Sequence, residues 1–184
     1  MPTLIAHTVV AVAAGISFAP QKVPKYFWSL AIIFSFLPDG DVIGFSLGFP
    51  YDHFLGHRGF FHSPFFGIWL SFFLMNIFVR DVPRFSKQWF FYFLFFFLLT
   101  ASHGFLDALT NGGLGIALLS PFDSTRYFLP WAPIEVSPIG IGSFISRRGL
   151  QVLESEWIWI WLPSFLIVLG SMLIRKRIKS LRKN

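Results

Sequence analysis

The chain has 184 residues, enough for one domain of ordinary size. Hydrophobic residues make up 54% of it and charged residues only 13%, against roughly 25% charged in typical soluble proteins, which excludes an ordinary water-soluble domain. The absence of cysteine excludes disulfides, thiolate nucleophiles and Cys-based zinc sites.

Apolar segments follow one another along the chain and predict an all-α integral membrane protein. We expect a bundle of about five transmembrane helices, each needing roughly 20 residues to span a bilayer. The expected helices cover about residues 3–19, 24–37, 59–80, 87–111 and 154–178, within a single membrane-embedded domain of residues 1–184. Two of them are marginal in length, and Pro20 and Pro38 are expected to end the first and second.

The region of residues 112–153 differs from these apolar segments because glycine and proline recur throughout it. Such punctuation breaks helices repeatedly, so we expect a long ordered extracytoplasmic loop with short helical turns. Its charged residues, and those at the start of the last helix, are expected at the surface or in loops, although one of them could reach over the site: Asp123, Arg126, Glu135, Arg147, Arg148, Glu154 and Glu156.

Most of the lysines and arginines fall on one side of this arrangement, which sets the expected orientation. They lie between the first two helices, between the third and fourth, and in the tail of residues 175–183. Basic loops favour the cytoplasm, so the N-terminus and the long loop should face outward from a bacterial inner membrane. The net charge of +6 and the basic tail could indicate nucleic acid, but a juxtamembrane anchor explains them better.

Histidines and acids recur at the outward ends of the first four expected helices. They are His7, Asp39, Asp41, His57, His62, His103 and Asp107. Ionisable groups in or near hydrocarbon are costly and usually face a shared interior site. We therefore expect one polar cluster at one depth of the membrane.

The spacing of these residues indicates metal chemistry. His103 and Asp107 are four apart on a helix and share a face, while Asp39 and Asp41 could bracket one cation or bridge two. Imidazole with carboxylate suits Zn²⁺, with Mn²⁺ or Fe as alternatives, in a hydrolytic site. The candidates exceed one tetrahedral shell, so one or two ions are expected, with a metal-activated water as nucleophile.

Several of these residues also have structural interpretations. His7 taken alone could be a hydrogen-bonded core histidine, and Asp39 could cap a helix end and leave Asp41 as the ligand. Arg58 could form an ion pair with Asp41 or Asp107, or could recognise phosphate through bidentate hydrogen bonds.

Residues 52–63, directly before the third helix, contain three histidines, an acid and an arginine. Asp52 is better suited to cap a turn than to bind metal, and His53 lacks a partner on a helix face, so both are expected at the periphery of the site. Ser63, followed by Pro64, is suited to cap the third helix.

Four motifs in this order resemble those of the YdjM-like, LexA-regulated family of inner-membrane-associated metal-dependent hydrolases. The motifs are His7, Leu37-Pro38-Asp39-Gly40-Asp41, His57-Arg58-Gly59-Phe60-Phe61-His62-Ser63, and His103-Gly104-Phe105-Leu106-Asp107 with Thr110. The resemblance runs from residue 1 to about 122, including Pro121-Phe122, and implies a metal-dependent hydrolase. A weaker likeness in ligand types and helical build, to zinc-dependent phospholipases C and P1-type nucleases, implies a phosphoester substrate.

The sequence thus predicts a membrane-bound metallohydrolase acting on a phosphoester of a lipid or other amphipathic substrate. The expected metal ligands are His7, Asp41, His57, His62, His103 and Asp107. Asp39 is expected to bridge two metal ions, to orient a ligand from outside the coordination shell, or to act as general base. Arg58 is expected to stabilise the anionic transition state. One alternative is a metal-binding or ion-transport protein without hydrolysis. Another is a structural metal that only holds the short first and second helices against the bundle. The third and fourth helices carry few polar residues toward the cytoplasmic half, which argues against a transport pathway.

Overall fold

The computed structural model describes residues 1–182 except Gln21 and Ile139, so Lys183 of the expected basic tail lies outside the described residues. The α-helices are α1 (Leu4–Phe18), α2 (Tyr26–Phe36), α3 (Ile43–Ser46), α4 (Pro64–Phe78), α5 (Lys87–Ala108), α6 (Ile141–Phe144), α7 (Arg147–Glu156) and α8 (Leu162–Leu181). Among the described residues no strand forms, and β pairing is limited to isolated bridges in the loop after α5. The all-helical prediction is confirmed.

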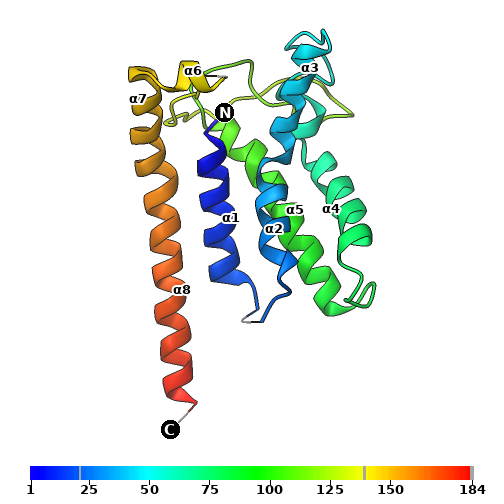
Figure 1. Ribbon diagram of the computed structural model, residues 1–184, viewed down its shortest axis with the longest axis vertical. Helices are drawn as coiled ribbons and strands as arrows, with labels where there is room; N and C mark the ends of the chain where they lie inside the picture. The colour runs from blue at the N-terminus through cyan, green and yellow to red at the C-terminus, as the bar shows by residue number, and fades with distance from the viewer. Residues whose placement is uncertain (21, 139, 183–184) are drawn as a thin grey trace.

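Helices α1, α2, α4 and α5 form a bundle in which successive long helices alternate in direction (Figure 1). Helices α7 and α8 are joined by a π-helical segment, Trp157–Trp161, into one long helix that packs beside α1 and extends past the bundle. The N-terminus, α3, α6 and the loop after α5 lie at one end of the molecule, and the C-terminus lies at the other.

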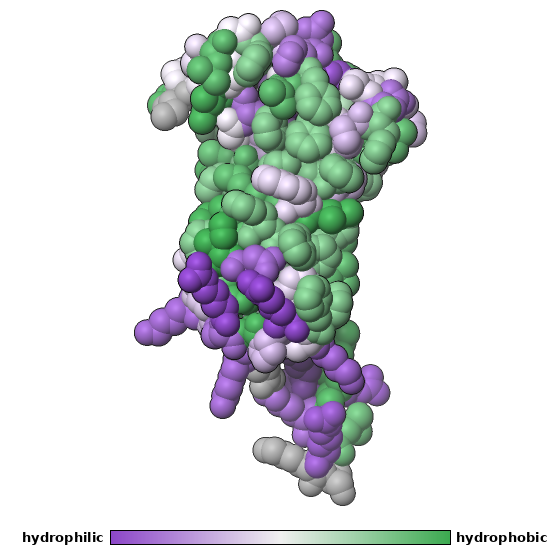
Figure 2. Space-filling view, turned by 90° about the vertical axis from the view of Figure 1, so that its right-hand side faces the viewer, coloured by the Kyte–Doolittle hydropathy of each residue, from purple (hydrophilic) through white to green (hydrophobic). Residues whose placement is uncertain are grey.

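Three helical stretches are long and apolar enough to cross a membrane: Tyr26–Ser46, Lys87–Ala108 and Arg147–Leu181. Helices α1 and α4 are apolar but have 15 residues each, about 22 Å of helix against a hydrocarbon core of roughly 30 Å. Five complete spans are therefore not confirmed. A broad hydrophobic band nevertheless crosses the side of the molecule, with hydrophilic side chains gathered toward the C-terminal end (Figure 2).

The third expected helix begins later than predicted. Helix α4 starts at Pro64, where the Ser63 side chain accepts a hydrogen bond from the Phe66 N–H. Proline suits the first helical position because its missing N–H would have no partner there. The capping role of Ser63 is confirmed and the start near Gly59 is wrong, because the chain forms a separate 3-10 turn, Phe60–His62, before the cap.

The second expected helix continues beyond its predicted end. Helix α2 stops at Phe36, but the chain keeps winding as a 3-10 helix, Leu37–Val42, and then as α3. Pro38 lies in the first turn of the 3-10 helix, where no N–H is required of it. Asp39 and Asp41 therefore stand on ordered helical backbone instead of following a helix end.

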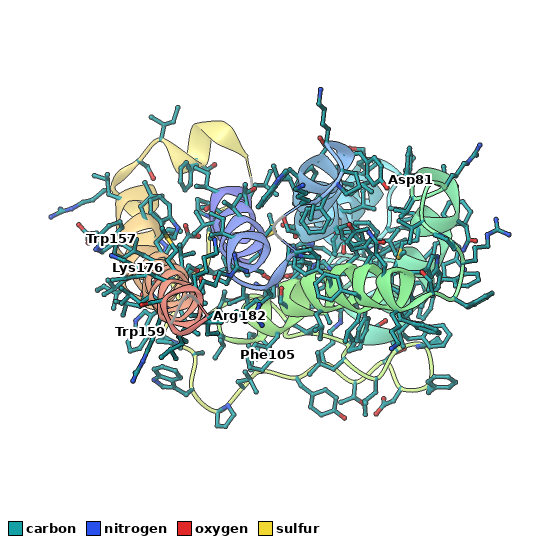
Figure 3. The ribbon with its side chains drawn as sticks, turned by 90° about the horizontal axis from the view of Figure 1, so that it is seen from below. Asp81, Phe105, Trp157, Trp159, Lys176 and Arg182 are labelled. Atoms are coloured by element: carbon teal, nitrogen blue, oxygen red, sulfur yellow. The ribbon has the colours of Figure 1, made fainter. Side chains whose placement is uncertain are left out.

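The last helix also begins earlier than predicted, at Arg147 instead of residue 154, so the loop before it is shorter and includes α6. Ser146 caps α7 by accepting a hydrogen bond from the Gly149 N–H. In the π-helical segment, Trp157 and Trp159 point away from the bundle (Figure 3) and are 57% and 42% exposed, as expected for aromatic side chains facing lipid.

Buried aromatic side chains fill the centre of the bundle. Phe34 of α2 stacks on Phe96 of α5 with ring centroids 4.6 Å apart, and Phe27 packs against Phe95 and Phe96. Phe27, Phe34 and Phe96 have no exposed surface. Rings packed in this way exclude water, so the polar end of the bundle rests on a dry core.

Candidate metal centre

The polar residues expected to converge are brought together and buried. They come from α1, the 3-10 helix after α2, the turn before α4, and the C-terminal part of α5. None is more than 7% exposed: His7, Asp39, Asp41, His57, Arg58, His62, His103 and Asp107.

One group among them, which we call the Asp39–Asp107 cluster, consists of Asp39, His62, His103 and Asp107. One possible ligand atom from each lies within 4.8 Å of all the others. His62 Nε2 lies 3.2 Å from His103 Nε2 and 3.3 Å from Asp107 Oδ2, and His103 Nε2 lies 3.2 Å from Asp39 Oδ1. Two imidazole nitrogens and two carboxylates thus surround a common point.

His7 of α1 adds a further nitrogen beside this cluster. Its ring stacks on His103 with centroids 3.9 Å apart, and its Nε2 lies 3.8 Å from Asp107 Oδ1. That nitrogen has no hydrogen-bond partner although it is buried. His7 is therefore not accounted for as a hydrogen-bonded core histidine.

The carboxylates of the Asp39–Asp107 cluster lack hydrogen-bond donors. Both oxygens of Asp39 and both oxygens of Asp107 are buried without a hydrogen-bond partner among the described residues. Unpaired buried carboxylate oxygens are costly, and nearly all buried polar groups find a partner. A divalent cation bound between these oxygens and the imidazole nitrogens would supply what they lack, so the residues present fit a metal ion.

The other ring nitrogens of the two histidines face different acceptors. His62 Nδ1 lies 3.1 Å from Asp41 Oδ2 without the alignment of a hydrogen bond, whereas His103 Nδ1 lies 2.7 Å from the Ser35 carbonyl oxygen and is hydrogen-bonded to it. A proton held on Nδ1 by such an acceptor leaves Nε2 with its lone pair facing the cluster, the arrangement found at most metal-binding histidines. Sequence reasoning had missed Ser35, because a backbone acceptor leaves no signature in residue type.

A second group, which we call the Asp41 network, consists of Asp41, His57, the Arg58 N–H and His62 Nδ1. Asp41 Oδ1 lies 2.7 Å from His57 Nδ1, and Asp41 Oδ2 accepts a hydrogen bond of 3.1 Å from the Arg58 N–H. Asp41, His57 and His62 also lie close enough to hold an ion. Unlike Asp39, however, Asp41 has a partner for each oxygen, so this group is satisfied without a cation.

Arg58 is fully buried and its guanidinium is held by protein groups. Nη1 donates to the Gly112 carbonyl at 2.6 Å, Nη2 donates to Thr110 Oγ1 at 2.9 Å, and Nε lies 3.5 Å from Asp107 Oδ2. Its backbone adopts a left-handed φ of 65° that is unusual outside glycine. The geometry matches the ion pair with Asp107, and contact with a substrate phosphate stays a prediction.

The turn that carries His62 lies against α5 because Gly104 has no side chain. A Cβ atom at Gly104 would stand 2.3 Å from the His62 carbonyl oxygen, closer than any real contact. Glycine between His103 and Asp107 therefore lets the turn approach the helix closely enough to bring His62 to both residues.

Electrostatics at His62 follow from its neighbours. Burial alone would lower the pKa of its imidazole, but the neighbouring carboxylates of Asp107, Asp39 and Asp41 outweigh burial and raise that pKa well above its ordinary value. These three carboxylates therefore favour a positive charge at the position of His62.

Three further side chains lie at the periphery of the site. His53 is exposed, as expected, and stacks on Phe49 with centroids 4.8 Å apart. Arg126 is the loop residue that reaches toward the site: it is half-buried and donates to the carbonyls of His57 and Tyr51 at 2.9 and 3.0 Å. The surface position expected for Glu156 is wrong, because the residue is fully buried and accepts hydrogen bonds from Thr3.

Apolar helices around a buried His/Asp centre define a membrane-embedded protein with a possible metal site. Comparison with known proteins agrees. Residues 1–178 match the family described as YdjM inner membrane protein, so the chain belongs to that family, and the match extends beyond the first 122 residues on which the resemblance rested. The chain is 34% identical over 182 residues to the inner membrane protein YbcI of Escherichia coli K12, covering 96% of this chain and 100% of that protein. No solved structure gives a significant match.

Proposed function

We propose that this protein is a membrane-bound metal-dependent hydrolase that cleaves a phosphoester of a lipid or other amphipathic molecule. The observation that carries the proposal is the set of partnerless carboxylate oxygens on Asp39 and Asp107 beside the Nε2 atoms of His62 and His103. Nitrogen and oxygen donors without thiolate suit Zn²⁺, with Mn²⁺ or Fe as alternatives.

Asp39, His62, His103 and Asp107 would hold one ion, with His7 as a further donor at its edge. Asp41 and His57, predicted from the sequence as ligands, are assigned instead to orienting His62, because Asp41 already has partners for both oxygens. A bound divalent ion would lower the pKa of a water molecule and polarise a phosphoryl oxygen.

The protein's own groups supply the remaining chemistry. One oxygen of Asp39 suffices as a ligand, so the other is available to accept a proton from the attacking water. The water oxygen bonds to phosphorus as the bond to the alcohol oxygen breaks, and the leaving alkoxide takes up the proton that Asp39 accepted from the water. Arg58 holds Asp107 and adds positive charge that favours an anionic phosphoryl group.

The proposed orientation places the site at the outer face of the inner membrane and the basic C-terminal end of α8 in the cytoplasm. Support comes from the lysines and arginines at the end of the molecule opposite the site, where hydrophilic side chains gather in Figure 2. A site at the level of the membrane interface suits a substrate whose head group enters from the bilayer.

A second candidate is a metal that stabilises the fold without catalysis, and one observation favours it. The donors of the Asp39–Asp107 cluster are at most 6% exposed, and closed sites are typical of structural zinc. Ion transport is less well supported, because Phe34 and Phe96 stack in the dry core between the site and the opposite end.

The test is a hydrolysis assay of protein purified with Zn²⁺ or Mn²⁺, on phospholipids and on bis(p-nitrophenyl) phosphate. Wild type and the exposed-histidine control His53→Ala should turn over at equal rates, and His62→Ala should be inactive. Absence of turnover by wild type, together with unfolding on metal removal, would favour the structural alternative.

A further inference from the structure

An apolar groove of about 610 Å³ runs between α1 and α8 on the side of the bundle. Its walls are formed by successive turns of the two helices and by the last residue of α2. The α1 wall runs from Leu4 to Ile16 and includes Val9, and opposite it lie Trp161 of the π-helical segment and Phe165 of α8.

The lining suits a hydrocarbon ligand. Nearly all of it is aliphatic or aromatic, and the Thr8 hydroxyl is already committed to the Leu4 carbonyl oxygen at 2.8 Å. The volume lies within the roughly 300–1,000 Å³ of ordinary ligand sites, but such sites also carry polar groups that recognise a polar ligand. Here the walls offer contact area and little hydrogen bonding.

Polar contacts at both ends fix the two helices beside this groove. At the end nearer the metal centre, the Thr3 hydroxyl donates to Glu156 Oε2 at 2.8 Å, and the Thr3 N–H donates to the same carboxylate. At the other end, Arg175 Nη2 donates to the carbonyls of Ser17 and Ala19 at 2.8 and 3.3 Å, where α1 ends. The groove is therefore a feature of how α1 and α8 are joined and not a general looseness between them.

The groove and the metal centre lie on neighbouring faces of the same two helices, α1 and α2. Ile5 and Thr8 line it, while His7 between them reaches the Asp39–Asp107 cluster from the neighbouring face of α1. Phe36 lines it, while the preceding residue, Ser35, holds His103 through its carbonyl oxygen.

The length of the groove matches one leaflet of a bilayer. From Leu4 to Ile16 the α1 wall rises about 18 Å, against about 15 Å for half of a hydrocarbon core. A groove that starts beside the site and descends through one leaflet has the dimensions of a lipid chain.

We infer that the groove between α1 and α8 binds one acyl chain of a bilayer phospholipid whose phosphate lies at the metal centre. The inference rests on the proposed hydrolase function and deepens it, because it makes the acyl chain a determinant of which phosphoester is cleaved. The lipid enters sideways from the membrane, and its chain contacts position the head group.

The test uses full-length protein in vesicles of phosphatidylethanolamine and phosphatidylglycerol, with a trace of phosphatidylglycerol bearing a diazirine midway along one acyl chain. Labelled positions are mapped by mass spectrometry after illumination. Val9→Trp fills the groove, and Leu166→Trp is the matched control, since Leu166 is 55% exposed on α8 and does not line the groove. Equal melting temperatures and metal contents verify that both variants fold.

We expect labels on lining residues of α1 and α8, falling roughly tenfold in Val9→Trp and unchanged in Leu166→Trp. Phospholipid hydrolysis should fall in Val9→Trp alone, while hydrolysis of bis(p-nitrophenyl) phosphate, which has no acyl chain, stays at the wild-type rate. Equal labelling in the two variants, or equal lipid turnover by them, would overturn the inference and leave the hydrolase proposal standing. Groove labelling without hydrolysis of any phosphoester would sink the hydrolase proposal and leave acyl-chain binding intact.

Discussion

The Asp39–Asp107 cluster and the Asp41 network share His62, one ring nitrogen of which faces each group. Both contain an acid and a histidine from the same two motifs. In the network, Asp41 has a hydrogen-bond partner for each oxygen, whereas in the cluster the oxygens of Asp39 and Asp107 accept no hydrogen bond from any described residue. The comparison teaches that residue type alone does not identify a metal ligand. A carboxylate whose oxygens already accept hydrogen bonds is suited to orient its neighbours, and one whose oxygens accept none is a candidate ligand.

The largest expected effect comes from neutralising the cluster. Asp107→Asn should lower metal affinity by more than about 100-fold, because mutating a residue that only orients a ligand typically costs about 10–100-fold and Asp107 is a candidate ligand itself. It also leaves Arg58 unpaired, and a buried charge without its partner costs about 3–5 kcal/mol. Metal content by mass spectrometry and calorimetric titration measures the first effect, and thermal unfolding the second.

Asp39→Asn distinguishes loss of metal binding from a folding defect, since no described arginine pairs with Asp39 and the substitution leaves no buried arginine unpaired. It should lose metal as fully as Asp107→Asn while melting close to wild type. Retention of a full equivalent of metal by both variants would place the ion elsewhere.

Asp41→Asn tests the other side of the comparison. Its expected loss of metal affinity is about 10–100-fold, because His62 keeps its place in the cluster but loses the carboxylate charge that lies 3.1 Å from its Nδ1. Calorimetric titration measures this. A loss as complete as that of Asp107→Asn would make Asp41 a ligand and would favour two ions.

Gly104→Ala should move the turn that carries His62 away from His103 and Asp107 on α5. The added Cβ would meet the His62 carbonyl at 2.3 Å, so the turn must move away from α5, at an expected cost of about 1–3 kcal/mol in unfolding free energy. Gly170→Ala is the matched control, since it meets no atom within 4 Å and lies in α8. Thermal melts that rank the two variants equally would contradict the close approach at Gly104.

The pH dependence should be the mildest effect, about tenfold in metal affinity per pH unit. The acids around His62 outweigh burial and raise its pKa, so at neutral pH the metal-free imidazole keeps a proton that an ion must displace. Metal affinity should therefore rise with pH until that raised pKa is passed. The folding stability of the metal-free protein should change with pH in the opposite direction. The stability contributed by charged His62 is present in full below its unfolded pKa of about 6.5 and is lost as pH rises through its folded pKa. Titrations in buffers of different ionisation enthalpy count the released proton, and its absence would contradict the assignment.

Much of the site could be predicted because ionisable residues stand out in so apolar a chain. His62, His103 and Asp107 were recognisable from type, spacing and their level on the expected helices. Helix ends were harder to predict, because Pro38 and Pro64 are compatible with helical turns on their C-terminal side, and only the packing around them decides where winding begins. Ser35, Glu156 and the groove between α1 and α8 could not be found, since each depends on which helices become neighbours.

The sequence by itself determined the all-helical class, the gathering of histidines and acids at one end and the basic character of the other. These follow from the cost of placing charge in hydrocarbon, which acts on residue type and helical position alone. Only the tertiary structure decided that His62 divides its two nitrogens between Asp41 and the Asp39–Asp107 cluster, and that Arg58 is occupied by Asp107, Thr110 and Gly112. Hydrogen bonds are directional and short-ranged, so their partners are chosen only once the backbone is in place.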